Sequence, residues 1–481
     1  MTSIGLLLLI LVLNGTAWAA ESDTVQPENT DRTAPVQGPS SPATRRAPST
    51  KQQLRELDRR LSVLESLAVG SGHKRGVMER GLGWSPEIKE RGFSLYSTDG
   101  NNRLHLNGGI QADYHGYPGG QTGRAPGAES DGFVLRRVRP ILDFRIANYF
   151  RGQIMPDLAP RRRSELFNAF IDWDYYDWAR VRVGQFKPVL NVENQQGEFD
   201  LVFAERSLVQ NFALRRDFGA TVTGRILDRH VRYDLAVFNS NNGAIGSASV
   251  PEPSVDNDKL GMARVMVTPF LLKGPRALRQ LDIGVGVLYG ACTNSACQQP
   301  MYTMGQDRII FQYQPTVTGN GFETKVLPQV TWFYGRLGVM ATFIHTWEPK
   351  IDKTTGQAGL LQNEAWMAQA EIAVTDDEPA FIRVTPKRPF DLSKKGRWGA
   401  WTIAARYSEQ RIDPQAFGLN FADATQYVRT TKATSFAVNW YASREFRYQW
   451  IWEHSEFQGA DQTYAASRTS DMLIFRFTLI Y

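Results

Sequence analysis

The stretch "RLHLNGGIQADYHGY", residues 103–117, decides the fold because its side chains alternate between apolar and polar. Leu104 and Leu106 fall on one face, while Arg103 and His105 fall on the other. This period of two is typical of a β-strand, whose successive side chains point to opposite faces. In a soluble sandwich the apolar face would meet a protein core; in an outer-membrane barrel it would meet lipid, and the polar face would line the lumen.

Segments of this kind recur to the end of the chain, separated by connections that are alternately long and short. That alternation is typical of outer-membrane barrels, which keep both termini and the short turns in the periplasm. We expect sixteen strands, at 103–116, 133–147, 149–157, 165–175, 179–186, 217–227, 230–239, 259–270, 279–290, 323–334, 336–347, 363–374, 398–410, 434–442, 445–457 and 471–481. Segment 309–317 breaks the parity and is assigned to an external loop, whereas 376–397 is placed on the periplasmic side although it is long.

The final strand, "DMLIFRFTLIY" (471–481), sets Phe475 and Phe477 in one apolar row that ends in the aromatic Tyr481. Such rows supply the aromatic girdles of a membrane barrel; in a soluble protein they would be core aromatics. The sequence therefore predicts an all-β fold, a 16-stranded antiparallel transmembrane β-barrel preceded by a short coiled-coil helix, with the barrel over 103–481.

The region before the barrel divides by composition. Residues 1–20 are typical of a signal peptide, with a retained membrane anchor as the alternative. Residues 21–50 are rich in Pro, Ser and Thr and are expected to be a disordered linker. Leucines at heptad spacing in 51–69 predict a coiled-coil oligomerisation helix rather than a solitary amphipathic one, and 70–102 is expected to be a second linker.

Charge and cysteine content limit the function. A net charge of +6 over 481 residues gives no reason to expect nucleic acid as a partner. Cys292 and Cys297 lie close together in an exported chain, which favours a disulfide; a metal site would need two further ligands. We expect no metal or cofactor. The six histidines fit no catalytic-triad signature, so the sequence predicts no enzyme.

Arginines dominate the face of the strands opposite the apolar row. An arginine facing the bilayer midplane would cost about 2–4 kcal/mol, so these side chains are expected to face the lumen. Inward-facing guanidinium groups concentrate anions; alternatively they brace the wall against Asp113, Asp143, Asp172 and Asp174. The cations expected to line the path are Arg137, Arg139, Arg145, Arg180 and Arg182 on strands and Arg206, Arg215 and Arg216 on the loop 187–217.

That loop is too long for a plain connection and carries apolar groups that need burial, so it is expected to fold into the barrel and constrict it. Within it, Glu205 and Asp217 are possible partners of the loop arginines.

The stretches "LNGGIQADY", "DGFVLRRVRPIL" and "VRVGQFKP" resemble the phosphate-selective porin O and P family. The resemblance implies a trimeric sixteen-stranded outer-membrane channel with an arginine-lined passage and an infolded third loop. Arg136, Arg137 and Arg139 match the family's Arg-Arg-x-Arg, and Lys187 matches the lysine that opens its constriction loop. Two positions depart from the family: Gly109 stands where phosphate-selecting members carry arginine, and Asn168 where many carry aspartate. Phosphate as the solute therefore does not follow.

The sequence predicts a passive channel for small anions in the bacterial outer membrane, surrounded by outer-membrane lipid and assembled as a homotrimer. A preference for phosphate or polyphosphate is left open. The alternatives are a porin that is non-selective or carries another solute, and a closed barrel that acts as a structural or adhesive envelope tether.

Overall fold

The computed structural model describes residues 84–88, 92–118, 131–159, 165–214, 216–239, 257–293, 301–302, 309–459 and 469–481. All of them belong to the second of two compact units, residues 78–481. The predicted signal peptide, first linker and coiled coil, residues 1–69, lie outside the described residues and stay predictions. No helix among the described residues is long and apolar enough to cross a membrane.

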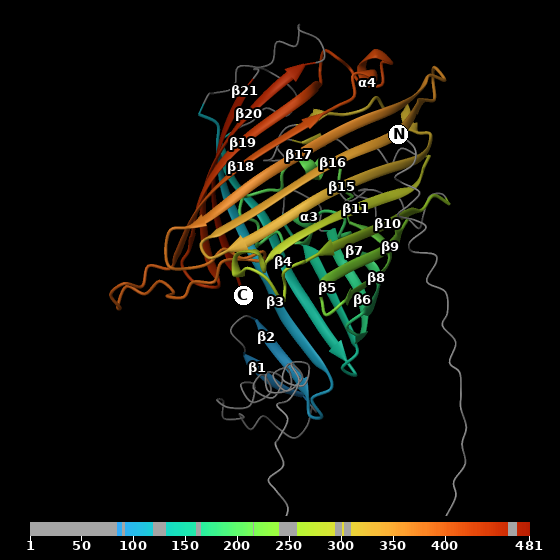
Figure 1. Ribbon diagram of the computed structural model, residues 1–481. Coiled ribbons are helices and arrows are strands. Elements are labelled where there is room, and N and C mark those ends of the chain that lie inside the picture. Colours follow the sequence, from blue (N-terminus) through green and yellow to red (C-terminus); the bar gives the residue numbers. More distant parts are fainter. Residues whose placement is uncertain are drawn as a thin grey trace, which may run out of the picture. The chain divides into compact units, whose positions relative to one another are not determined.

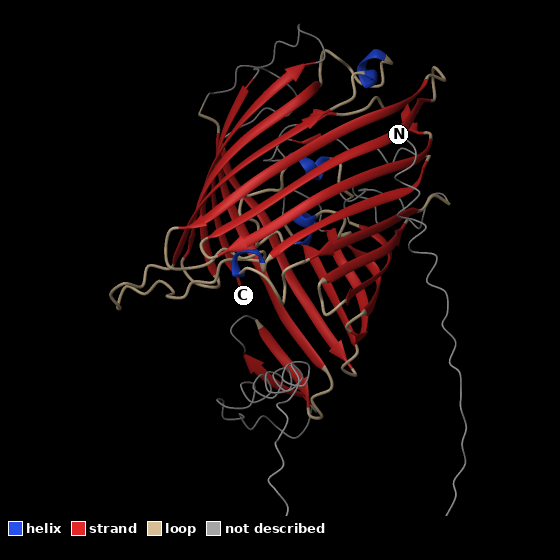
Figure 2. Ribbon diagram, viewed as in Figure 1, coloured by secondary structure: helices blue, strands red, loops and turns tan. Residues whose placement is uncertain are grey.

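Sixteen strands form a closed antiparallel barrel, as the sequence predicts (Figures 1 and 2). Each strand pairs with the next, and β21 pairs with β3 to close the ring. The wall consists of β3 (Arg103–Gly116), β4 (Gly132–Ile146), β5 (Phe150–Asp157), β6 (Glu165–Tyr176), β7 (Ala179–Phe186), β8 (Asp217–Ile226), β9 (Val231–Phe238), β10 (Leu260–Val267), β11 (Leu281–Cys292), β15 (Gly321–Tyr334), β16 (Leu337–Asp352), β17 (Ala358–Ala373), β18 (Ala400–Arg411), β19 (Val428–Tyr441), β20 (Phe446–Gly459) and β21 (Thr469–Ile480). Closure leaves no unpaired strand edge in the bilayer.

A hairpin extends the wall beside the closing strand. Strands β1 (Trp84–Ile88) and β2 (Phe93–Ser97) pair with each other, and β2 pairs with the first residues of β3. Strand β21 pairs with the later residues of the same edge, so β2 and β21 lie end to end along β3. Residues 70–102 are predicted to be a linker, but β1 and β2 lie within them. Strands of five residues are too short to show a clear alternation of apolar and polar side chains.

Connections at the two ends of the barrel differ in length. The end that holds the C-terminus has mostly tight turns, such as Ala147–Asn148, where both residues have positive φ as a type I′ turn requires. This is the periplasmic end by the rule for bacterial barrels. The connection 374–399 is the long exception there. At the other end, β13 (Ile309–Phe311) pairs with β12 (Met301–Tyr302) and β14 (Val317–Gly319) pairs with β16, all outside the sixteen-strand ring.

The barrel is partly filled by its own loops. The connection between β7 and β8 carries α3 (Val192–Gln195) and the 3-10 helix η1 (Leu208–Asn211), and its apolar side chains are buried against the inner wall. The connection between β18 and β19, with α4 (Gln415–Gly418), joins the same cluster. The wall contributes inward-facing apolar residues, Leu260, Met262, Leu288, Leu327, Met340, Ile344, Leu361 and Met367. These positions are apolar because they face packed loops rather than water.

Candidate functional site

A β-bulge in β4 turns two successive arginines into the lumen. Gln111 lies opposite Arg137, but Ala112 lies opposite Leu135, so Arg136 is the extra residue. Both arginines are buried, with 8% of Arg136 and 3% of Arg137 exposed. Strict alternation, as used for the sequence, would point only one of them inward. The bulge thus doubles the positive charge that this strand presents at one level.

Glu205 of the infolded loop binds both of these arginines. Its Oε1 accepts from Arg136 Nε at 2.8 Å and its Oε2 from Arg137 Nη2 at 2.7 Å. Arg476 of β21 donates to Glu205 Oε1 at 3.0 Å and grips Asp113 of β3 with two further hydrogen bonds of 2.6 and 2.7 Å. Burial alone would raise the pKa of the Glu205 carboxyl, but Arg136, Arg137 and Arg476 outweigh it and hold that pKa well below its usual range. Glu205 therefore fixes the loop to the wall as a carboxylate.

A second loop carboxylate, Glu198, is surrounded by four cations. It forms ion pairs with Arg139 at 2.9 Å, Arg216 at 3.2 Å, Arg206 at 3.3 Å and Lys187 at 3.4 Å. Burial would raise the Glu198 pKa, but the charges of Lys187, Arg216, Arg139 and Arg206 hold it well below its usual range. The pKa of Lys187 is also lowered, by burial first and then by the neighbouring charge of Arg206.

Around the constriction, the described residues place seven cationic side chains beside four carboxylates, and the surplus is positive. The cations are Arg136, Arg137, Arg139, Lys187, Arg206, Arg216 and Arg476, and the carboxylates are Asp113, Asp157, Glu198 and Glu205. Most of the predicted arginines are thus engaged with carboxylates, and the two main partners come from the loop.

On the periplasmic side of the constriction, three arginines lie side by side on neighbouring strands. Arg103 of β3 lies opposite Arg145 of β4, and Arg145 lies opposite Arg151 of β5. All three line an inner cavity of ≈ 330 Å³ near the periplasmic end. Arg151 pairs with Asp174 at 2.8 Å, whereas Arg103 and Arg145 form no ion pair within the described residues. Directly opposed like charges destabilise a sheet, so a negative charge between the side chains would stabilise this row. Asp143 and Asp172 line the same cavity.

The remaining predicted residues are placed as follows. Arg182 pairs with Asp172 of β6 at 2.6 Å, at the edge of the same cavity. Arg180 is half-buried and lies 3.4 Å from the Thr223 hydroxyl. Arg215 lies outside the described residues. Cys292 ends β11, and its predicted partner Cys297 is also outside them, so the disulfide stays a prediction. No group of metal-ligating side chains occurs in the part of the chain that the structure describes.

Sequence reasoning missed several inward-facing arginines, Arg151 and Arg264 among them, although the alternation of their strands carries the signal. Three more of these contact the infolded loop. Arg447 of β20 donates to the carbonyls of Phe199 and Leu201 at 2.9 Å each. Arg406 of β18 donates to the Glu205 carbonyl at 3.0 Å, and Arg476 donates to the Ala204 carbonyl. These guanidinium groups satisfy loop carbonyls that are buried away from water, as buried backbone requires.

The long connection 374–399 extends from the periplasmic end of the barrel and contacts the infolded loop. Gln196 Nε2 donates to the Phe381 carbonyl at 2.7 Å, and Arg383 lies 3.6 Å from Asp200 in an ion pair. Val384 is buried against Ala400 and Tyr441 of the wall. Loops from both ends of the barrel therefore meet inside it.

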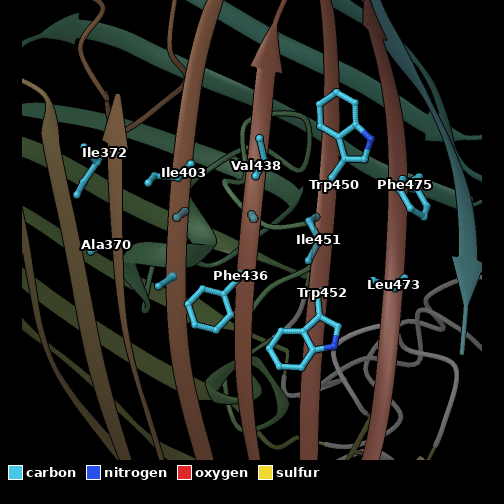
Figure 3. A pocket seen from close by; sticks show the side chains of 13 residues that line it. Ala370, Ile372, Ile403, Phe436, Val438, Trp450, Ile451, Trp452, Leu473 and Phe475 are labelled. Atoms are coloured by element: carbon cyan, nitrogen blue, oxygen red, sulfur yellow. The ribbon is translucent and has the colours of Figure 1, made fainter. Parts of the chain in front are cut away.

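The outer wall shows the pattern of a lipid-facing surface. An apolar hollow of ≈ 490 Å³ faces away from the lumen, over β17 to β21 (Figure 3). Ile372, Ile403, Phe436, Trp450 and Trp452 line it, and each is more than a third exposed. Its position on the outside separates it from the passage.

Nearer the periplasmic end, Trp401, Trp440 and Tyr448 stack on the outer wall, with ring centroids 5.5 Å and 5.2 Å apart along the row. Stacked Trp and Tyr side chains at one level are typical of the membrane interface.

A closed sixteen-stranded barrel with an apolar outer band and a charged interior defines an outer-membrane porin, located in the bacterial outer membrane. The family model described as phosphate-selective porin O and P matches residues 104–477, and the chain belongs to this family. No curated protein matches the chain.

Solved outer-membrane proteins resemble the chain at low identity. DcaP, an outer-membrane channel of Acinetobacter baumannii, is 8% identical, with 80% of this chain and 99% of that chain covered and a TM-score of 0.48. OmpT of Vibrio cholerae in a trimer form is 8% identical, with 79% and 99% covered and a TM-score of 0.47. An anion-selective porin from Comamonas acidovorans is 10% identical, with 79% and 100% covered and a TM-score of 0.46.

Proposed function

We propose that this porin is a passive channel that prefers small anions, and that the row of Arg103, Arg145 and Arg151 carries the preference. Two of these guanidinium groups form no ion pair within the described residues, and all three face one inner cavity. Fixed positive charges inside a low-dielectric wall raise the local concentration of anions and repel cations. Guanidinium groups bind the oxygens of phosphate and carboxylate through paired N–H donors.

Phosphate is one candidate solute, and the two family departures bear on it. A Cβ at Gly109 would lie 2.8 Å from both the Leu479 carbonyl oxygen and the Phe199 ring, so the infolded loop occupies the space that an arginine would need. Asn168 accepts from Arg216 at 3.0 Å, where an aspartate would add a negative charge. These contacts support passage of small anions more strongly than a tight phosphate site at the constriction.

The test is the reversal potential of single channels in a planar bilayer under a KCl gradient, with and without added phosphate. We expect chloride to carry most of the current. The double variant Arg103→Ala and Arg145→Ala should shift the reversal potential toward that of potassium. The matched control is Arg336→Ala, an exposed arginine in the β15–β16 turn that pairs with Asp376 at 3.3 Å. A cation-selective wild type would contradict the proposal.

Homotrimeric assembly is proposed from the resemblance to the family and from the trimer form of OmpT. Light scattering of the detergent-purified protein measures it directly, with a mass of three chains expected.

A closed barrel that serves as an envelope tether is the second candidate, because the loops 187–216 and 374–399 meet inside the lumen. Single-channel conductance distinguishes the two: a tether would show no openings in wild type.

A further inference from the structure

The outer half of the β17–β18 connection, residues 385–398, leaves the barrel sideways at its periplasmic end (orange in Figure 1). Its exposed cations are Lys387, Arg388, Lys394, Lys395 and Arg397, and Asp391 is its single acid. Lys387 pairs with Glu378 at 3.2 Å and Lys394 with Asp391 at 3.4 Å. The other three cations form no ion pair within the described residues. This segment, which we call the basic loop, therefore carries an uncompensated positive charge.

The basic loop also exposes large apolar side chains. Leu392 is 85% exposed and Trp398 is 64% exposed. Phe390 stacks edge-on against Trp440 of the outer wall at 5.1 Å, and Trp440 Nε1 donates to the Trp398 carbonyl at 2.8 Å. Because Trp440 belongs to the aromatic row that marks the membrane interface, these contacts fix the base of the loop at the level of the lipid headgroups.

Backbone hydrogen bonds hold the loop in shape. Phe390 N donates to the Ala442 carbonyl at 2.7 Å, and Asp391 N donates to the Arg397 carbonyl at 3.1 Å. The Asp391 carboxylate accepts from the backbone and hydroxyl of Ser393 at 3.0 and 2.6 Å. The loop is thus a preorganised turn, so binding a partner costs little ordering entropy.

We propose that the basic loop binds anionic phospholipids of the periplasmic leaflet, with Arg388, Lys395 and Arg397 on the phosphates and Leu392 and Trp398 inserted among the acyl chains. Charge alone would suit any acidic partner. The exposed Leu392 and Trp398, continuous with the aromatic row, require a partner with an apolar layer beneath its phosphates, and a phospholipid surface provides one. The site is distinct from the channel lumen and does not depend on the channel's anion preference.

Native mass spectrometry of the detergent-purified full chain tests this, with phosphatidylglycerol and phosphatidylcholine offered at equal concentration. We expect wild type to retain more phosphatidylglycerol than phosphatidylcholine. Each surface cation contributes about 1 kcal/mol to binding an anionic membrane surface, so the double variant Lys395→Glu and Arg397→Glu should bind phosphatidylglycerol at least about 30-fold more weakly.

The matched control is the double variant Lys353→Glu and Arg429→Glu, which reverses two exposed cations near the opposite end of the barrel. It should retain phosphatidylglycerol as wild type does, and both double variants should keep the wild-type conductance, which verifies the folded barrel. Equal retention of the two lipids by wild type would refute the proposal. Equal losses in the two double variants would refute it as well, and so would an unchanged affinity in the basic-loop variant.

Discussion

Replacing Glu205 by glutamine should loosen the constriction loop without unfolding the barrel. The carboxylate forms three ion pairs of 2.7 to 3.0 Å with Arg136, Arg137 and Arg476, and all four side chains are buried. Glutamine keeps the size but removes the charge, so three guanidinium groups lose their common counter-charge. Breaking a buried ion pair by changing one partner costs about 3–5 kcal/mol. Glutamine can still accept hydrogen bonds, so we take about 3 kcal/mol.

That energy raises the equilibrium population of the detached loop roughly 150-fold, since every 1.4 kcal/mol is a factor of ten. Single-channel recording should show frequent transitions between conductance levels that are rare in wild type. The control is Glu364→Gln, because Glu364 forms an exposed ion pair with Arg411 at 3.1 Å on the outer wall, which contributes at most about 1 kcal/mol. If Glu205→Gln showed transitions between conductance levels as rarely as the control does, Glu205 would not be the residue that anchors the loop.

Three further predictions concern the same interior. The pKa of Glu205 is lower in the folded protein than its usual value of 4.5, so the stability that its ion pairs contribute is complete above pH 4.5 and is lost only as pH falls through the lower folded pKa. Single-channel recordings of wild type should therefore show few transitions between conductance levels down to pH 4.5. Transitions that become more frequent between pH 7 and 5 would contradict this. Arg383→Ala removes the ion pair to Asp200 and should raise single-channel conductance, because the periplasmic connection 374–399 then loses a contact with the infolded loop. Arg388→Ala on the same connection is the control. Equal conductance in the two variants would contradict a constricting role for this connection. Gly109→Arg should displace Phe199 and reduce the yield of folded barrel, which is measured by heat-modifiable mobility on gels. The control Gly132→Ala should fold normally, because a Cβ at Gly132 meets nothing within 4 Å. Normal folding of Gly109→Arg would contradict the prediction by showing that the loop can move aside.

The strands of the wall could be predicted from the sequence because a membrane barrel requires apolar side chains toward lipid and polar side chains toward the lumen, alternating along each strand. Strands β3 and β7 have the bounds that alternation predicts, and the arginines of β4 and β7 face inward as expected. Alternation fails at Arg136, because a bulge inserts one residue and no residue type announces it.

The interior of the barrel was less predictable. Inward-facing Met340 and Ile344 interrupt the polar lumen, because they cover loops whose docking depends on contacts between segments far apart in the chain. The role of Glu198 as a common partner of four cations has the same origin, since side chains from β4 and from distant loop positions converge on it. Sequence reasoning identified most of the cations and named Glu205 as a partner, but of the loop arginines rather than of Arg136, Arg137 and Arg476. It did not identify Glu198, because the path of the loop is set by tertiary packing.

The seam of the barrel has a consequence for biogenesis. Tyr481 exchanges two backbone hydrogen bonds of 3.1 Å with Gly108, and β21 closes the ring of sixteen strands by pairing with β3. A ribosome makes β3 before the other wall strands and β21 after them, so the cylinder cannot be sealed until β21 has been made. Until then both ends of the growing sheet are exposed templates for other chains. The order of the strands therefore requires the open edges of β3 and β20 to be protected until β21 pairs with both of them.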